Sequence, residues 1–120
     1  MQNIFPTNSE VLLLGYNNQT AKIIKILNKK YNITPTLFAT NRPGKLFSLF
    51  IHYTFWNQEL PNNNYYTVHT ILDISKSLPS EHRILVPCTS LFQKMAWEYA
   101  DFFESEYILC DVKDIQELFV

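Results

Sequence analysis

Residues 11–15 of the chain are Val-Leu-Leu-Leu-Gly, a continuous apolar run that ends at a glycine. Such a run, without polar alternation, is typical of a strand that is covered on both faces, as in a parallel sheet. A polar loop follows, and from Thr20 apolar side chains recur at helical spacing, with lysines on the opposite face. We expect Asn18 or Thr20 to cap this helix. Asn32 and Pro35 are expected to end it, because proline disfavours helix at the residue before it.

A second apolar stretch, residues 36–39, follows this helix and completes a strand–helix–strand unit within about thirty residues. Further strands are expected at 52–56, 84–86 and 107–110, and further helices at 66–78, 90–103 and 111–119, with Ser90 as the cap of the helix at 90–103. The alternation predicts an α/β fold, namely one open, mainly parallel, Rossmann-like sheet of about five strands with helices on both faces. Residues 1–120 are expected to form a single domain.

The composition excludes several classes of protein. Of the 120 residues 47% are hydrophobic, and the formal net charge is −1. Without a basic field the chain is not expected to bind nucleic acid or an anionic membrane, and the lysines of the first helix indicate a solvated face. No apolar run approaches the roughly 18 residues of a membrane helix, and no signal-like segment opens the chain. We therefore expect a cytoplasmic protein, with Cys88 and Cys110 as free thiols.

In open α/β sheets, ligands bind beyond the carboxyl ends of the strands, which here means the loops at 15–19, 40–44 and 87–90. The first loop stands where a dinucleotide fingerprint would be but lacks two of its three glycines. Thr40 stands where a ribose-binding acid is expected, so NAD is not a predicted ligand. The N–H groups at the helix start can hold a carboxylate or phosphate, and a plain turn with asparagine caps is the alternative.

No catalytic residue and no metal ligand is assigned from the sequence. The three histidines are scattered, no phosphate loop is present, and the aspartates show no paired arrangement. Cys88 follows a strand and precedes a helix, which allows an activated nucleophile, although an inert buried thiol fits the same position. Arg42 lies in the turn after the second strand, where it can reach an anionic ligand or simply be solvated.

Aromatic residues gather in the middle of the chain, and two interpretations remain open. They fill the core beside an edge strand, or part of the group forms a docking face for another domain. The residues concerned are Tyr53, Phe55, Trp56, Tyr65 and Tyr66.

Three stretches together resemble the N-terminal domain of ATP-grasp carboxylate–amine ligases, in the branch that contains D-aspartate ligase. The stretches are residues 11–36, with their opening strand, helix and second strand; residues 48–56; and residues 83–109. The likeness is one of order and spacing, and it covers nearly the whole chain. Ser90 departs from it, since the family usually carries an acidic residue in the loop after the fourth strand.

The resemblance implies a pre-ATP-grasp domain belonging to a longer protein, which would join a carboxylate to an amine through an acyl-phosphate. ATP and Mg²⁺ would bind in a downstream ATP-grasp domain. This chain would hold no cofactor, would be catalytically silent alone, and would supply scaffold and contacts to the small-molecule substrate. The resemblance and the strand-end loops together suggest these substrate contacts: Gly15, Tyr16, Asn17, Asn18, Thr40, Arg42, Thr89 and Ser90.

Two alternatives of other classes remain. The chain is a free-standing Rossmann-like module that binds a small molecule or nucleotide, or it is a non-enzymatic interaction domain that uses its aromatic face. A homodimer is left open in each case.

Overall fold

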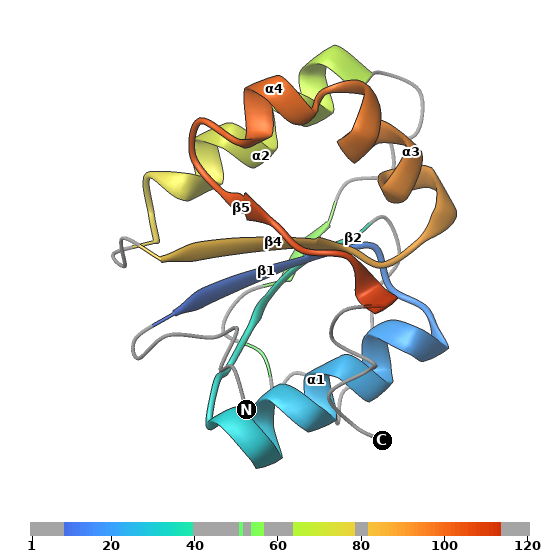
Figure 1. Ribbon diagram of the computed structural model, residues 1–120, viewed down its shortest axis with the longest axis vertical. Helices are drawn as coiled ribbons and strands as arrows, with labels where there is room; N and C mark the ends of the chain where they lie inside the picture. Colours follow the sequence, from blue (N-terminus) through green and yellow to red (C-terminus); the bar gives the residue numbers. More distant parts are fainter. Residues whose placement is uncertain (1–8, 40–50, 52–53, 57–63, 79–81, 114–120) are drawn as a thin grey trace.

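The computed structural model describes residues 9–39, 51, 54–56, 64–78 and 82–113, and Figure 1 shows their arrangement. Strands and helices alternate along most of the chain. In order they are β1 (Glu10–Leu14), α1 (Asn18–Tyr31), β2 (Thr36–Ala39), β3 (Thr54–Trp56), α2 (Asn64–Ser75), β4 (Arg83–Pro87), α3 (Ser90–Glu98), α4 (Ala100–Phe103) and β5 (Ile108–Leu109).

The strands form one sheet in the order β3-β2-β1-β4-β5, and every pairing in it is parallel. From β1 the chain first builds outward through β2 and β3, and then crosses to the other side of β1 to add β4 and β5. The strand order therefore reverses between β1 and β4. The α/β class and the Rossmann-like parallel sheet predicted from the sequence are confirmed.

The apolar run of β1 lies at the centre of the molecule because both faces of the sheet are covered. Val11 and Leu13 belong to the core cluster beneath α1, whereas Leu12 and Leu14 belong to the cluster beneath α2, α3 and α4. Figure 1 shows α1 on one side of the sheet and α2, α3 and α4 on the opposite side. Successive side chains of β1 thus pack into two separate cores, as expected for a strand whose side chains point alternately to the two faces of a covered sheet.

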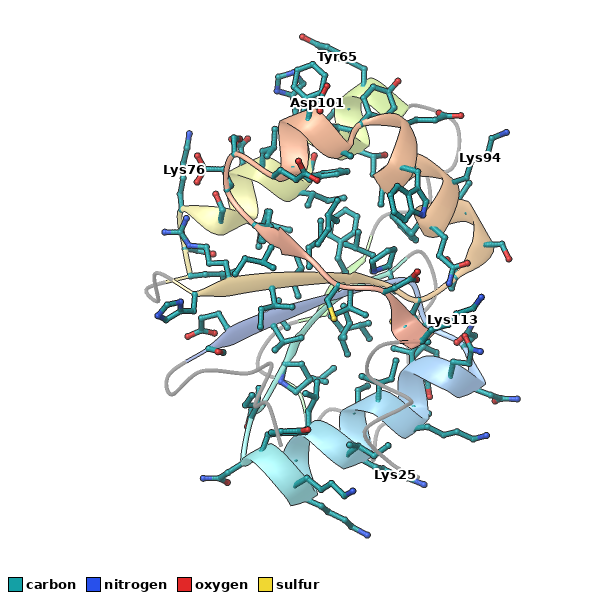
Figure 2. All side chains as sticks on the ribbon, viewed as in Figure 1. Lys25, Tyr65, Lys76, Lys94, Asp101 and Lys113 are labelled. Carbon is teal, nitrogen blue, oxygen red and sulfur yellow. The ribbon has the colours of Figure 1, made fainter. Side chains whose placement is uncertain are left out.

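The exposed face of α1 carries its lysines, as the sequence predicted, and Figure 2 shows Lys25 on the side of the helix away from the sheet. Asn32 ends the helix in the left-handed conformation, and its N–H donates to Leu27 O. None of the described helices combines the length and the apolar character that a membrane span requires.

Several predicted boundaries were wrong. The N-cap of α1 is Asn17, not Asn18 or Thr20, and the N-cap of α3 is Thr89, not Ser90. The helix predicted at 90–103 is interrupted at Tyr99, where φ is −116° and ψ is 26°, so that it forms α3 and α4.

The second helix spans 64–75 rather than 66–78, and the fifth strand is shorter than predicted, at 108–109; the third strand is described at 54–56. Residues 112–113 are helical, while the rest of the last predicted helix, 114–119, and residues 52–53 lie outside the described residues.

Tyr107 ties the edge of the sheet to α2. Its hydroxyl donates a 2.7 Å hydrogen bond to Ile71 O in the buried core. Burial raises the pKa of this phenol above its ordinary value, the nearby Arg83 charge lowers it, and the Glu106 charge raises it further. The hydroxyl is therefore held in the neutral form that donates.

We expect Tyr107→Phe to lower the free energy of unfolding by about 1 kcal/mol, because a buried carbonyl loses its side-chain donor. Urea denaturation monitored by circular dichroism measures this change. Tyr65→Phe is the matched control, since the Tyr65 side chain is exposed, and it should leave stability within about 0.5 kcal/mol of the parent. Equal stability of the two variants would contradict the role given to the Tyr107 hydroxyl.

Candidate functional site

The loops that leave β1 and β4 meet at the carboxyl ends of these two strands. Cys88 N–H donates to Leu14 O at 2.8 Å, and Gly15 N–H donates to Phe38 O at 2.7 Å. Gly15 has a φ of +86°, and a Cβ at this position would lie 2.5 Å from two side-chain atoms of Thr89. Glycine is therefore needed both for the turn and for the close approach of the second loop.

A small hydrogen-bond network fixes the start of α1 against both loops. Asn17 Oδ1 accepts the Thr20 N–H at 3.0 Å, and Thr20 Oγ1 accepts the Asn17 N–H at 3.1 Å. The Thr20 hydroxyl lies 2.9 Å from Gly15 O, to which it can donate, and Asn17 Nδ2 donates to Cys88 O at 3.4 Å. This is a capping box whose cap residue also reaches the neighbouring loop. The network orients the helix N-terminus toward the ends of β1 and β4.

A crevice of about 450 Å³ lies over this junction. Neutral hydrogen-bonding side chains dominate its lining, together with one tryptophan, one carboxylate and one lysine. The lining residues are Asn17, Gln19, Cys88, Ser90, Gln93, Trp97, Asp111, Val112 and Lys113. The point at which the strand order of an open α/β sheet reverses is where such folds bind ligands.

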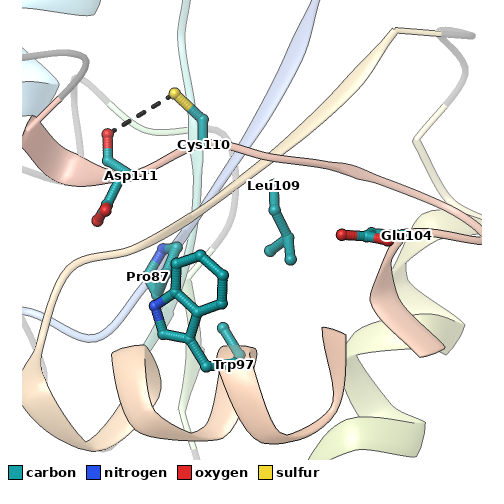
Figure 3. Close-up of a pocket in the computed structure, with 7 residues that line it drawn as sticks. Pro87, Trp97, Glu104, Leu109, Cys110 and Asp111 are labelled. Atoms are coloured by element: carbon teal, nitrogen blue, oxygen red, sulfur yellow. Dashed lines mark hydrogen bonds between the residues drawn. The ribbon is translucent and has the colours of Figure 1, made fainter. Parts of the chain in front are cut away.

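A second cavity of about 230 Å³ adjoins the crevice, and Figure 3 shows the residues around it. Trp97 and Asp111 line both cavities. The remaining lining of the second cavity comes from Pro87, Ala96, Glu104, Leu109 and Cys110.

The eight predicted contact residues differ in their place relative to the crevice. Asn17 and Ser90 line the crevice, whereas Gly15 and Thr89 pack against each other behind it. Tyr16 is half-buried against the core beneath α1, and Asn18 is exposed in the first turn of α1 outside the lining. Thr40 and Arg42 lie outside the described residues.

Sequence reasoning missed five lining residues. Gln93 and Trp97 are one and two helical turns beyond Ser90, so the spacing of the third helix contained a signal for them. Asp111, Val112 and Lys113 follow the fifth strand, and the rule that selected the other strand-end loops applied to them as well. Gln19 lies in the first turn of α1 and is not among the missed five, because it belongs to the loop at 15–19 that the sequence selected, although it was not named as a contact.

Cys88 lies at the crevice but is not an activated nucleophile. Burial raises the pKa of its thiol to about 12. Hydrogen bonds with the Thr20 side chain and the Leu14 backbone lower this pKa, but by less than burial raises it. The thiol is therefore neutral at physiological pH, which agrees with the inert, buried alternative considered from the sequence. Within the part of the chain that the structure describes, no group of three or more histidine, cysteine, aspartate or glutamate side chains could hold a metal ion.

We expect Gly15→Ala to lower the free energy of unfolding by about 2–4 kcal/mol, from backbone strain at positive φ and overlap with Thr89. Adding Thr89→Ala removes the two side-chain atoms nearest the new Cβ and should restore about 1 kcal/mol, whereas Thr89→Ala alone should cost little. Urea denaturation of the parent, the two single variants and the double variant measures the coupling. Purely additive effects would show that the two loops do not touch as described.

We expect Cys88 to resist alkylation in the folded protein. A pKa near 12 in place of the ordinary 9.0 leaves about a thousandfold less thiolate. In a Cys110→Ser variant, iodoacetamide at pH 8 should therefore modify Cys88 only after unfolding, as followed by mass spectrometry. Rapid modification of the native variant would contradict the buried position of this thiol.

Comparisons with protein-family models, with curated proteins and with solved structures yield no match to this chain. Its function is therefore inferred from the geometry of the crevice, together with the resemblance described above.

Proposed function

We propose that this chain is a Rossmann-like domain that binds a small carboxylate-bearing molecule in the crevice between α1 and α3. We further propose that it serves as the substrate and scaffold domain of an ATP-dependent carboxylate–amine ligase of the ATP-grasp type. The observation that carries the first part is the position of a polar crevice at the point where the strand order reverses. The second part rests on the resemblance in sequence.

The charges around the crevice favour an anionic group. The N-terminal ends of α1 and α3 both contribute to its lining, and neither helix has an acidic residue in its first turn. No acidic residue of their own first turns therefore offsets the partial positive charge of these helix ends, and Asp111 is the carboxylate that lines the crevice with them. Lys113 adds a full positive charge, and Figure 2 shows it beside the beginning of α1.

The amide and hydroxyl side chains provide the directional contacts. Gln19, Gln93 and Ser90 offer both donors and acceptors, which suits a carboxylate flanked by other polar groups. Asn17 is committed to the capping box and to Cys88 O, so it shapes the crevice more than it offers new bonds.

The first loop argues against a dinucleotide in this crevice. Gly15 supplies the tight turn, but Tyr16, Asn17 and Asn18 occupy the positions where backbone must approach a pyrophosphate closely. A nucleotide would therefore bind in a separate downstream domain, as the resemblance implies. The joining chemistry, with its ATP and Mg²⁺, would also occur there.

Exposed aromatic side chains favour the interaction domain as a second candidate. Tyr65 is 71% exposed and Phe102 is 59% exposed, on the helical layer that lies opposite α1. Exposed aromatic groups are enriched at interfaces, and a domain that packs against a neighbour would present them.

We expect succinate, as a simple dicarboxylate, to shift the ¹⁵N–¹H resonances of Gln19, Ser90 and Gln93 in the full 120-residue chain. ATP with Mg²⁺ should show no measurable binding in isothermal titration. Lys113→Gln should weaken succinate binding about two- to fivefold, because one exposed charge is lost. Lys94→Gln is the matched control, since this exposed lysine of α3 does not line the crevice.

Two results would contradict the proposal. Micromolar binding of ATP with Mg²⁺ to this chain would place the nucleotide here rather than downstream. Succinate shifts that are absent, or that lie away from the crevice, would remove the anion site.

A further inference from the structure

The second cavity continues the crevice past Trp97, and its chemistry is different. Trp97 is 72% exposed, although an indole ring has a large apolar surface that usually packs against protein. Figure 3 shows this ring beside Pro87 and facing the strand that carries Leu109. An exposed aromatic ring that lines two adjoining cavities is placed to contact a ligand.

The charges of the second cavity are all negative. Glu104 and Asp111 line it, and they lie on opposite sides of Trp97 in Figure 3. Among the described residues neither carboxylate forms an ion pair. The sequence contains no lysine, arginine or histidine between Lys94 and Lys113; Glu104 lies well inside this stretch, whereas Asp111 shares the crevice with Lys113.

The Asp111 carboxylate is held in place. Its Oδ1 accepts the Val112 N–H at 3.1 Å, and the backbone before it is fixed where Cys110 N–H donates to Leu85 O at 2.9 Å. The Cys110 thiol also lies 3.7 Å from Asp111 O, as the dashed line in Figure 3 marks. The position of this carboxylate is therefore set by the end of β5.

We propose that the second cavity is a subsite for an organic cation, either a primary ammonium or a guanidinium group. The cation pairs with Glu104 beside the Trp97 ring, and a methylene chain packs against Leu109 and Ala96 on its way past Asp111 to the crevice. A positive group over an indole face is attracted by the ring quadrupole, and nearby carboxylates add to this attraction.

This inference rests on the proposed function and extends it. The crevice has a positive end at α1 and Lys113, and the second cavity gives it a negative end at Glu104. The ligand is therefore an elongated molecule with a carboxylate at one end and a cation at the other. Trp97 and Asp111, which line both cavities, lie where the middle of such a molecule passes.

Three probes of similar length separate the two ends. ε-Aminocaproate carries both charges, caproate lacks the ammonium group, and hexylamine lacks the carboxylate. Each is titrated into the ¹⁵N-labelled 120-residue chain, with the Trp97 indole N–H as the reporter for the second cavity and the Gln93 side-chain amide for the crevice. We expect ε-aminocaproate to bind about tenfold more tightly than either single-charge probe and to shift both reporters.

Variants assign the cation end. Glu104→Gln removes one carboxylate at constant size and should weaken ε-aminocaproate and hexylamine about threefold, while leaving caproate unchanged. Trp97→Leu should weaken the same two probes about two- to fivefold. Glu98→Gln is the matched control, because this exposed glutamate of α3 lines neither cavity. Trp97, Glu98 and Glu104 are all exposed, so we expect the three variants to fold like the parent.

The outcomes distinguish failure of the two proposals. If caproate binds as tightly as ε-aminocaproate, the cation subsite is overturned and the anion site stands. If hexylamine binds as tightly as ε-aminocaproate, the cation subsite stands and the proposed carboxylate site fails. If no probe shifts either reporter, both are overturned, and equal effects of Glu104→Gln and Glu98→Gln would overturn the assignment of the cation to Glu104.

Discussion

The contact between the ends of β1 and β4 is the constraint on which the rest of the structure depends. Cys88 N–H donates to Leu14 O, and the Thr89 side chain packs where a Cβ of residue 15 would stand. The two strands pair over five residues, from Glu10 with Arg83 to Leu14 with Pro87. Because the pairing is parallel, both strands end at the same edge of the sheet, and the segments that follow them must diverge there.

That divergence creates the crevice. One loop turns into α1 on one side of the sheet, and the other turns into α3 on the opposite side. The two helix N-termini therefore border one opening, and Asn17 reaches across it to Cys88 O. The residues after β5 complete the lining, since β5 lies next to β4 and ends at the same edge. The crevice is polar because of where it lies. It is bordered by strand ends and by the first turns of two helices, and the N–H groups of a first helical turn have no partner within the helix.

The strands and the end of α1 could be predicted because their signals are local. Residues 11–14 and 36–39 are continuous apolar runs, and Asn32 followed by Pro35 marks a helix end in any context. The break at Tyr99 could not be predicted, because the apolar spacing of residues 92–103 continues across it. The exposure of Trp97 could not be predicted for a related reason. Its exposure depends on where β5 lies, and the sequence near Trp97 contains no information on that.

The location of the candidate site could be predicted from the sequence, but most of the residues that line it could not. Strand-end logic selected the loops after β1 and β4, and Asn17 and Ser90 do line the crevice. Asp111 and Lys113 follow β5, to which strand-end logic also applies, but they reach the crevice only because β5 lies next to β4, and that neighbourhood is a tertiary fact. The second cavity is likewise formed by α3, α4 and β5 together, so no single stretch of sequence indicates it.

Native-state hydrogen exchange tests the central claim most directly, because it measures whether the β1–β4 junction is a fixed platform. The amides of Cys88, Gly15 and Thr20 donate to Leu14 O, Phe38 O and Asn17 Oδ1. We expect these three amides to exchange only by global unfolding, with the same opening free energy as the central amides of β1. Exchange of the three by a separate, much cheaper opening would contradict the account, since the crevice would then have no fixed shape.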